Sequence, residues 1–588
     1  MTGPLQALAA RYERLAAKGE LPAFGYSSEK ISYALVLSPA GNLLDVQPLL
    51  DTTGRKPQPR AMLVPQGVKR TSGIASNFLW DKTSYVLGVS AKEGGRLAQE
   101  HAAFRKLHED LLVGSDDEGL QALLAFLRGW SPERFAVPPF APEMLDTNLV
   151  FRLDGDVFLH DRPAARDIWL SYLGSADAPK AMCLVTGRSA PVARLHPAIK
   201  GVMGAQSAGA SLVSFNLDAF TSHGKEQGAN APVSEAAAFG YGATLNALLA
   251  KGSRNVVRIG DATVVFWADV PEAEVIVHGL FDPPPPDEKS EAAAVRDVLE
   301  QMARGRPIRE VRPDIAEDTR FYVLGLSPNA ARLSMRFWHE TTFGDLTRHF
   351  QEHWQDLRLE PSPWGGSPPA LWRLLMELAP QGKAENVPAH LAGELTRSVL
   401  TGGRYPRALL AAALMRMRAD RAVNGRRVAL CKAVIVRELR CNSSSSAEDH
   451  LVSLDRDETN PGYRLGRLFA VLEDIQRAAL GWSVNATIRD RYYGAASATP
   501  ASVFPLLIRN ANHHLASIRK VRGGGLAYAL EKEMGQILDG FGTVLPRNLG
   551  IEDQGRFAIG YYHERFGRPS GLPDDETSPD ATDTDSES

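Results

Sequence analysis

The chain has 588 residues, of which 44% are hydrophobic and 23% charged, a balance typical of a globular protein of about two to four domains. The net charge of −3 hides an uneven distribution, because residues 574–588 hold seven acids and no base, while the rest has 62 acids and 66 bases. Three cysteines are too few for a disulfide framework, and no uncharged apolar run approaches the roughly 18 residues of a membrane span. We therefore expect a cytoplasmic protein without a membrane segment.

Residues 1–345 are predicted to mix helices with short strands. The first helix is amphipathic, with Leu5, Leu8 and Tyr12 on one face, and further helices are expected near 96–112 and 234–250. Hairpin signals recur where a turn separates two strand-like runs: ISYALVL before 39–42, NLVFRL and VFLH around 154–156, NVVRI and TVVFWA around 260–261, and FYVLGLSPNAARLSMRFW at 321–338. The pattern predicts an α+β fold with antiparallel strand pairs.

Strand signals nearly vanish after residue 345, and the remaining chain is predicted to be helical. We divide it into a basic helical region at 346–447, a helical bundle at 448–568 and an acidic tail at 569–588, which we expect to be disordered. Two low-complexity segments interrupt the chain, a proline-rich break at 281–291 and a serine-rich joint at 441–450.

One helix of the bundle has clear ends in the sequence. Thr459 or Asn460 can cap it, Pro461 fits its first position and Gly481 stops it. The segment 460–481 therefore predicts a single helix.

The loop at 214–234, SFNLDAFTSHGKEQGANAPVS, is polar and punctuated by glycines. Its Lys225, Gln227 and Asn230 offer one charge and two amide groups, while Gly224 and Gly228 permit close approach and unusual backbone angles. This composition indicates a binding loop.

Familiar catalytic motifs fail on inspection. The loop is not a nucleotide-binding P-loop, because Glu226 follows Lys225 where Ser or Thr is required. Neither Ser207 nor Ser211 has the two flanking glycines of a hydrolase nucleophile, and the adjacent histidines at 513–514 would point to different faces of a helix. We therefore predict no catalytic residues, no metal site, no cofactor and no enzyme.

A second polar loop lies at 64–88, VPQGVKRTSGIASNFLWDKTSYVLG. Its polar members precede or lie among aromatic ones: Lys69, Arg70, Thr71, Ser72 and Asn77, with Phe78, Trp80 and Tyr85. One interpretation is a structural corner, with the rings in the core and the two cations in solvent. The other is a nucleic-acid reader, in which cations hold phosphates while amides and hydroxyls reach base edges.

Residues 396–440 are strongly basic. They hold eleven Lys or Arg against only Asp420 and Glu438, a net charge of +9. Such a surplus fits a solvated helical face or a path for a polyanion such as DNA.

Long blocks of the sequence resemble one known family. The 64–88 and 214–234 loops, the hairpin segments NVVRIGDATVVFWAD and FYVLGLSPNAARLSMRFW, and the later NPGYRLGRLFAVLEDIQ, DRYYGAASATPASVFPLLIRNANHHL and QGRFAIGYYHER follow one another as in the large subunit of the type I-C CRISPR interference (Cascade) complex. The resemblance runs from residue 25 to about residue 565.

The resemblance implies a non-catalytic subunit of a crRNA-guided complex that recognises double-stranded DNA. Such subunits read the protospacer-adjacent motif (PAM), help to open the strands and stabilise the R-loop, and offer a docking surface to the helicase-nuclease, while guide pairing reads the target. The implied partners are target DNA, a crRNA-bearing assembly with backbone and 5′-handle-binding Cas subunits, a small subunit and the helicase-nuclease.

With DNA as the ligand that the resemblance implies, we assign roles to the polar residues from their own chemistry. The expected PAM-binding residues are Lys69, Arg70, Thr71, Ser72, Asn77, Lys225, Gln227 and Asn230, and the expected DNA-backbone contacts are Arg404, Arg416, Arg426 and Arg427. Other function classes stay open: a metal-dependent nuclease, for which the sequence offers no carboxylate cluster, and a purely architectural subunit without DNA contact.

In this family the C-terminal helical region is also made separately, as the small subunit. The serine-rich joint suits such an internal start. No methionine lies between Met417 and Met534, so the start would need a non-ATG codon, such as one at Val452.

Overall fold

A computed structural model describes residues 2–567 with short gaps. Outside the described residues are 1, 52–57, 69, 71–72, 93–95, 176–178, 260–261, 282–289, 365–368, 384–385, 443–450, 482–483, 485, 522–523, 543 and 568–588. The acidic tail and most of the proline-rich break and serine-rich joint therefore lie outside them. The chain folds into two compact units, unit 1 (1–200 with 206–247) and unit 2 (201–205 with 248–588).

Unit 1 contains a four-stranded sheet in the order β3-β2-β7-β6. The strands are β2 (Tyr33–Leu37), β3 (Leu43–Pro48), β6 (Trp80–Lys82) and β7 (Asn148–Leu153). The β2–β3 hairpin is as predicted, and β2 runs parallel to β7. The predicted second hairpin is wrong in part, because VFLH makes only one bridge to β7, at Phe158, and then enters a 3-10 turn.

Helices α3 (Leu97–Leu112) and α4 (Glu118–Gly129) supply much of the hydrophobic core of this sheet. Phe104, Phe126 and Phe151 are buried together there. The short α2 (Thr83–Val86) follows β6 directly and contacts α3. Because α2 and β6 are consecutive, the polypeptide around residues 80–86 is held on the sheet and on the helices at once.

Unit 1 also contains a second, three-stranded sheet of β1 (Tyr26–Ile31), β5 (Gln58–Pro65) and β4 (Leu50–Asp51). The predicted first helix, α1 (Pro4–Ala17), buries Leu8 and Tyr12 as expected. It packs on α6 (Glu235–Leu248), where Tyr12 meets Phe239 edge to face. The remaining elements are α5 (Pro163–Ser175), the hairpin β8 (Lys180–Met182) and β9 (Ser189–Pro191), and the pair β10 (Ala198–Ile199) and β11 (Ala210–Ser211).

Unit 2 begins with an antiparallel sheet whose neighbouring strands are β15-β14-β13-β12. Both predicted hairpins are confirmed, β12 (Val256–Ile259) with β13 (Ala262–Ala268) and β14 (Arg320–Asn329) with β15 (Arg332–Thr342). The first helices of the unit are α7 (Pro271–Phe281), α8 (Ser290–Ala303), α9 (Ile308–Val311) and α10 (Phe343–Leu357).

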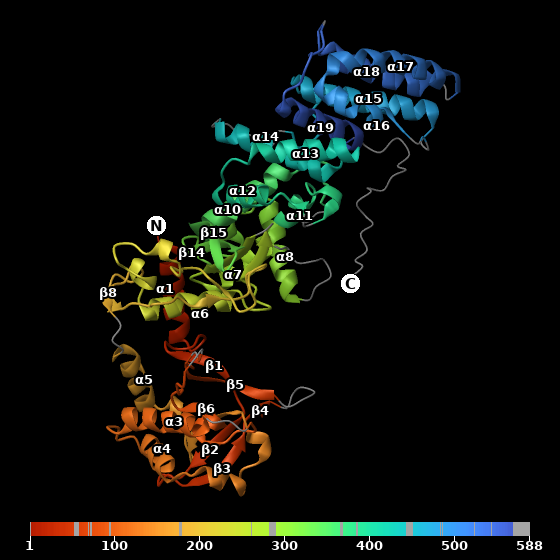
Figure 1. Cartoon of the computed structure of the whole chain (residues 1–588). Helices are drawn as coiled ribbons and strands as arrows, with labels where there is room; N and C mark the ends of the chain where they lie inside the picture. The colour runs from red at the N-terminus through yellow and green to blue at the C-terminus, as the bar shows by residue number, and fades with distance from the viewer. Residues whose placement is uncertain are drawn as a thin grey trace. The chain divides into compact units, whose positions relative to one another are not determined.

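The later helices continue the same hydrophobic core, which runs from Ile259 to Tyr562. They are α11 (Leu371–Met376), α12 (Ala389–Thr401), α13 (Arg407–Asp420), α14 (Gly425–Asn442), α15 (Pro461–Leu480), α16 (Ile488–Ala498), α17 (Pro500–Val521), α18 (Gly524–Asp539) and α19 (Ile551–Phe566) (Figure 1). The concentration of strands in the first half and of helices in the second confirms the α+β prediction. The sheet of unit 2 shares its hydrophobic core with the helices that follow it.

The predicted ends of α15 are confirmed. Asn460 Oδ1 accepts hydrogen bonds from the backbone N–H groups of Gly462 and Tyr463, Pro461 occupies the first turn, and Gly481 follows the last. No helix in the described part of the chain is long and apolar enough to cross a bilayer.

The last helix packs against α15 unusually closely. A Cβ atom at Gly462, Gly466 or Gly560 would overlap a carbonyl oxygen of the opposite helix. Since α19 also contacts α13 and α14, it lies between the basic helical region and the bundle.

Candidate nucleic-acid interface

The loop after β5 is fixed by one buried carboxylate. Asp81 is fully buried, accepts a hydrogen bond from the Asn77 backbone N–H at 2.9 Å and forms an ion pair with Arg70. Burial raises the pKa of Asp81, while Arg70 and the backbone donors act in the opposite direction. The Arg70 guanidinium also lies 3.9 Å from the centroid of the Tyr85 ring and donates through Nε to the Ala75 carbonyl. Arg70 is therefore engaged within the loop.

Asn77 also serves the loop internally. Its side chain is buried, and Oδ1 accepts a hydrogen bond from the Val68 backbone N–H at 2.9 Å. Two residues on, Leu79 adopts a φ of 62° and donates its N–H to Nε2 of the buried His108. Of the other predicted residues here, Lys69, Thr71 and Ser72 lie outside the described residues.

Beside this loop lies a cavity of about 660 Å³, which we call the basic hollow. Its lining includes Arg70, Gly73, Lys82, Ser84, Tyr85, Ser90, Lys92, Arg96, Leu97, Glu100 and Asp146. Lys82, Lys92 and Arg96 are exposed, and their side chains form no ion pair with any residue that the structure describes. These three cations are available to a ligand, unlike Arg70.

The second predicted loop is held in shape by hydrogen bonds of the Asn230 side chain, which we call the Asn230 staple. Its Oδ1 accepts from the Ser222 N–H, and its Nδ2 donates to the carbonyls of Lys225 and Gln227 at 3.0 and 3.1 Å. The staple holds a tight turn in which Gly224 has a φ of 69°, as the sequence predicted. Asn230 therefore supports the shape of the loop.

The staple presents Lys225 to solvent. The Lys225 side chain is exposed, whereas Gln227 is half-buried and its Oε1 has no hydrogen-bond partner within the described chain. Gly228 lies against the backbone of Ala193 and donates to the Arg194 carbonyl at 3.1 Å, so its close approach is to the protein itself. No hydrogen bond or ion pair joins the described residues of this loop to those of the first.

The predicted DNA-backbone arginines of unit 2 are all engaged in ion pairs. Arg416 pairs with Asp420, and Arg427 bridges Asp420 at 2.7 Å and Glu377 at 3.7 Å. Both are largely covered, with side chains 15% and 11% exposed.

The other two arginines are more open. Arg426 pairs with Glu377 at 3.3 Å and is 34% exposed, and Arg404 pairs with Glu438 at 3.6 Å and is 54% exposed. Ion pairs this exposed are weak, so these two guanidinium groups can exchange partners at low cost.

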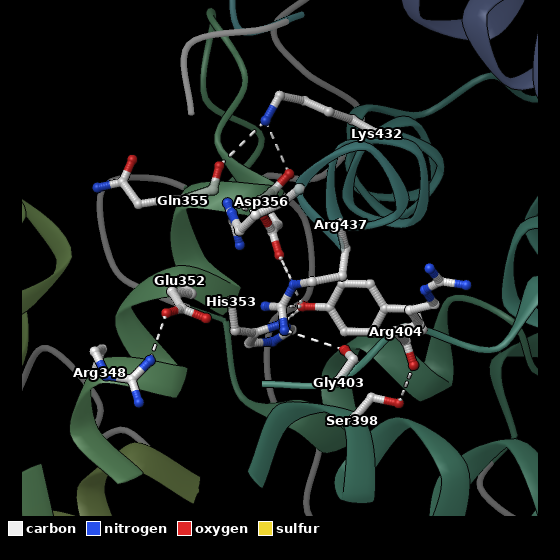
Figure 2. Close-up of polar contacts among 12 residues, drawn as sticks. Arg348, Glu352, His353, Gln355, Asp356, Ser398, Gly403, Arg404, Lys432 and Arg437 are labelled. Atoms are coloured by element: carbon white, nitrogen blue, oxygen red, sulfur yellow. Dashed lines mark hydrogen bonds and ion pairs between the residues drawn. The ribbon is translucent and has the colours of Figure 1, made fainter. Parts of the chain in front are cut away.

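Other cations of the basic stretch are structural. Figure 2 shows Arg437 of α14 beside the Asp356 carboxylate of α10, with an Nε–Oδ2 distance of 2.6 Å. Both side chains are fully buried, and Arg440 contacts the other carboxylate oxygen at 2.6 Å. Lys432 donates to the carbonyls of Gln355 and Asp356 and so caps the C-terminal end of α10.

Tyr405 and His353 complete this cluster. The Tyr405 hydroxyl accepts a hydrogen bond from Arg437 Nη2 at 3.1 Å and lies 2.6 Å from His353 Nδ1. Burial, followed by the charge of Arg437, lowers the pKa of His353 to about 3, so the ring is neutral near pH 7. Several of the cations in residues 396–440 are thus used in ion pairs and hydrogen bonds that join α10, α13 and α14.

With this geometry established, sequence comparison identifies the family. The sequence matches the CRISPR-associated protein (Cas_Csd1) family over residues 8–567. The chain belongs to this family. Csd1 proteins are type I-C large subunits, so the resemblance is confirmed, and the chain is a subunit of a Cascade complex that assembles with other Cas proteins in antiviral defence. No curated protein matches the sequence.

The sequence analysis of this Csd1 chain missed the basic hollow. Lys82 lies within the 64–88 block, but Lys92 and Arg96 come from the segment between α2 and α3, which was not singled out. The available signal was the basic, glycine-containing run AKEGGR at 91–96 that directly precedes a predicted helix. Its relation to the polar loop depends on packing of α3 against α2, the short helix that follows β6, which local sequence does not reveal.

Proposed function

We propose that this Csd1 chain is the non-catalytic, DNA-recognising large subunit of its complex. It reads the PAM in double-stranded target DNA, assists strand opening and R-loop stabilisation, and offers a docking surface to the helicase-nuclease. The crRNA reaches the complex through the backbone and 5′-handle-binding Cas subunits, and guide pairing reads the target sequence.

The basic hollow carries the proposal. Three exposed cations, Lys82, Lys92 and Arg96, line one cavity and are free of ion pairs among the described residues, which is the arrangement that phosphate contacts need. Glu100 and Asp146 lie in the same lining, so the hollow is of mixed charge. Such a surface binds a duplex more weakly than a uniformly basic groove, which suits a subunit that must sample and release many sequences.

The two loops have different roles in this proposal. Arg70 and Asn77 hold the first loop in shape, and Lys69, Thr71 and Ser72 remain proposed PAM contacts on it. In the second loop, Lys225 contacts a phosphate and Gln227 contacts a base edge or enters the opened duplex, with Asn230 as their support.

The exposed arginines of unit 2 are proposed as contacts to opened DNA. Arg404 and Arg426 can exchange their carboxylate partners for phosphates, and such exchange is favoured at low salt. Arg416 and Arg427 contribute less, because each is largely covered by its own ion pairs.

We also propose that the C-terminal bundle is made separately as the small subunit from a start near Val452. In the full chain, the Val452 carbonyl accepts a hydrogen bond from the Glu360 N–H, and α19 packs on α13 and α14. A separate bundle would lose these contacts and expose the corresponding face. A second, shorter polypeptide copurifying from the untagged gene supports this start, and an intact complex without one contradicts it.

The decisive experiment uses complexes assembled with the Lys82→Ala/Arg96→Ala double variant. We expect normal assembly, but binding to PAM-containing duplex weaker by roughly tenfold or more, since two phosphate contacts are lost. Lys106→Ala, on the exposed side of α3 and paired with Asp110, is the matched control. Unchanged duplex affinity in the double variant contradicts the proposal.

Two further readouts separate the other function classes. Crosslinking of Lys225 or Arg96 to PAM DNA contradicts the purely architectural subunit. Cleavage of plasmid by the full chain with Mg²⁺ or Mn²⁺ favours the metal-dependent nuclease.

A further inference from the structure

A cavity of about 260 Å³ lies where α15, α16 and α17 meet in unit 2. We call it the bundle pocket, and its lining is Leu472, Gln476, Ala486, Thr487, Ile488, Arg491, Tyr492, Leu507, Asn510, Ala511 and His514. Its volume is below the range of about 300–1,000 Å³ common for drug-sized ligands. The pocket therefore suits a single flat group better than a large ligand.

The helical register explains why polar groups gather there. Leu507, Asn510, Ala511 and His514 follow the spacing i, i+3, i+4, i+7 on α17, so they share one face. Leu507 and Ala511 are buried on this face, whereas Asn510 and His514 occupy positions where a bundle normally places apolar residues. Polar residues at such positions weaken packing, so their presence calls for a partner.

The protein supplies hydrogen-bond partners to only some of the polar side chains that line the pocket. Gln476 Oε1 accepts a hydrogen bond from the Ile488 N–H at 2.8 Å, which joins α15 to the start of α16. Among the described residues, the side chains of Asn510 and Arg491 have no hydrogen-bond or ion-pair partner. The half-buried amide of Asn510 is open to water in the pocket rather than bonded to the protein, so a ligand can bond to it in place of water.

The pocket is also lined by an aromatic ring and has positively charged side chains close to it. The Tyr492 ring is partly buried against the hydrophobic core and lines the pocket. Helix α17 has no Asp or Glu in its 22 residues, and its exposed Arg509 directly precedes Asn510. An aromatic face, an amide and nearby cations are the combination that binds single-stranded nucleic acid.

We propose that the bundle pocket receives one base of a single-stranded nucleic acid. The base stacks on Tyr492, its edge bonds to the amide of Asn510, and Arg491 and Arg509 contact the adjoining phosphates. An apolar side chain from a protein partner fits less well, because it leaves the amide of Asn510 unpaired. The inference rests on the proposed function, since opening of the target duplex supplies the unpaired strand.

His514 fits the same role. Burial, together with the neighbouring His513, lowers the pKa of His514. The ring is then neutral near pH 7 and offers one donor and one acceptor to a base edge.

The test compares two substitutions of the stacking ring in the full chain. Tyr492→Phe keeps the aromatic face, and Tyr492→Leu removes it. We expect Tyr492→Leu to weaken binding of a fluorescein-labelled oligothymidylate about tenfold, as for loss of one stacked base, while Tyr492→Phe stays close to the parent. Fluorescence anisotropy measures the affinity, and circular dichroism melting verifies that both variants fold.

A matched pair on α17 tests the edge contact independently of the ring. Asn510→Ala should weaken binding of the same oligonucleotide. Asn512→Ala, at an exposed residue of the same helix, should leave the affinity unchanged. Ultraviolet crosslinking of an oligonucleotide with 5-iododeoxyuridine should label Tyr492. Equal affinity of parent, Tyr492→Leu and Asn510→Ala overturns the proposal, as does a crosslink of this region to another Cas subunit in place of the oligonucleotide.

The outcome is separable from the proposed function. If Lys82→Ala/Arg96→Ala weakens PAM-duplex binding but Tyr492→Leu leaves single-strand binding unchanged, only the bundle pocket assignment fails. If the basic hollow variant binds duplex normally while Tyr492→Leu loses the single strand, the proposed function fails and the pocket stands.

Discussion

The basic hollow of unit 1 and the basic helices of unit 2 use positive charge in opposite ways. The helices hold many more cations, yet Arg427, Lys432 and Arg437 are buried and bonded within the protein. The hollow has few cations, but Lys82, Lys92 and Arg96 are exposed and unpaired among the described residues. Local net charge is therefore a poor guide to how many cations are available to a ligand, and the partners of each cation are a better one.

The largest expected effect tests the structural use of charge in unit 2. Asp356→Ala leaves Arg437 buried without its carboxylate, so the free energy of unfolding of unit 2 should fall by about 3–5 kcal/mol. Urea denaturation of the full chain measures this. Glu438→Ala, which removes only partly exposed ion pairs, should cost less than about 1 kcal/mol. Equal losses in the two variants would remove the distinction between buried and exposed charge.

The first loop of unit 1 is supported by the neutral ring of His108, which accepts a hydrogen bond from the Leu79 N–H. Protonation of this ring in acid should therefore destabilise the protein. Burial lowers the pKa of His108 to about 4, against about 6.5 in an unfolded chain. The unfolded chain then takes up a proton more readily, so this stabilisation is complete above pH 6.5 and is lost as the pH falls towards 4. At pH 5 the loss is about 2 kcal/mol.

His108→Gln provides the comparison, because the other histidines are unchanged and their contributions cancel. Denaturation at pH 7 and pH 5 should show a smaller loss of stability in this variant than in the parent. If both lose the same stability, His108 is not the titrating group.

The arginines of α13, α14 and the loop before α13 sharpen the comparison within one region. Arg404→Glu with Arg426→Glu should reduce the salt dependence of binding to opened DNA, lowering the slope of log affinity against log salt by about 1–2. Arg427→Ala should leave that slope unchanged but destabilise unit 2, because it removes the largely covered cation that bridges Asp420 and Glu377. A double variant with the parent's slope would exclude Arg404 and Arg426 from the DNA path.

The smallest expected effect concerns Lys225. Lys225→Ala should weaken binding to PAM-containing duplex several-fold and lower the salt slope by about 1, as for loss of one phosphate contact. Gln227→Ala should also weaken binding to this duplex, but it should not change the salt slope, because the glutamine side chain carries no charge. Lys200→Ala, another exposed lysine of unit 1, is the control, and target affinity unchanged in both loop variants would count against a role for this loop.

Features with local causes could be predicted from the sequence. The cap at Asn460, the hairpin at β14 and β15 and the turn at Gly224 each depend on a few neighbouring residues. The family could also be recognised, because long blocks carry far more information than a short motif.

Features that depend on residues far apart in the sequence could not be predicted in this way. Asp356 and Arg437 are 81 positions apart, so no local pattern marks Arg437 as buried. Asn77 carries a side chain typical of base readers, and only its bond to the Val68 N–H shows that it is used internally. The basic hollow likewise needs α3 to be packed on α2 before Lys82 and Arg96 form one surface.

The contact between α15 and α19 bears on how the chain is made. Gly462 and Gly466 receive the backbone of a helix that is synthesised almost a hundred residues later. Until α19 emerges from the ribosome, the face of α15 that receives it lacks this partner. We therefore expect translation to finish α19 before the bundle closes, so that nascent chains halted before residue 551 are trapped by chaperones or degraded.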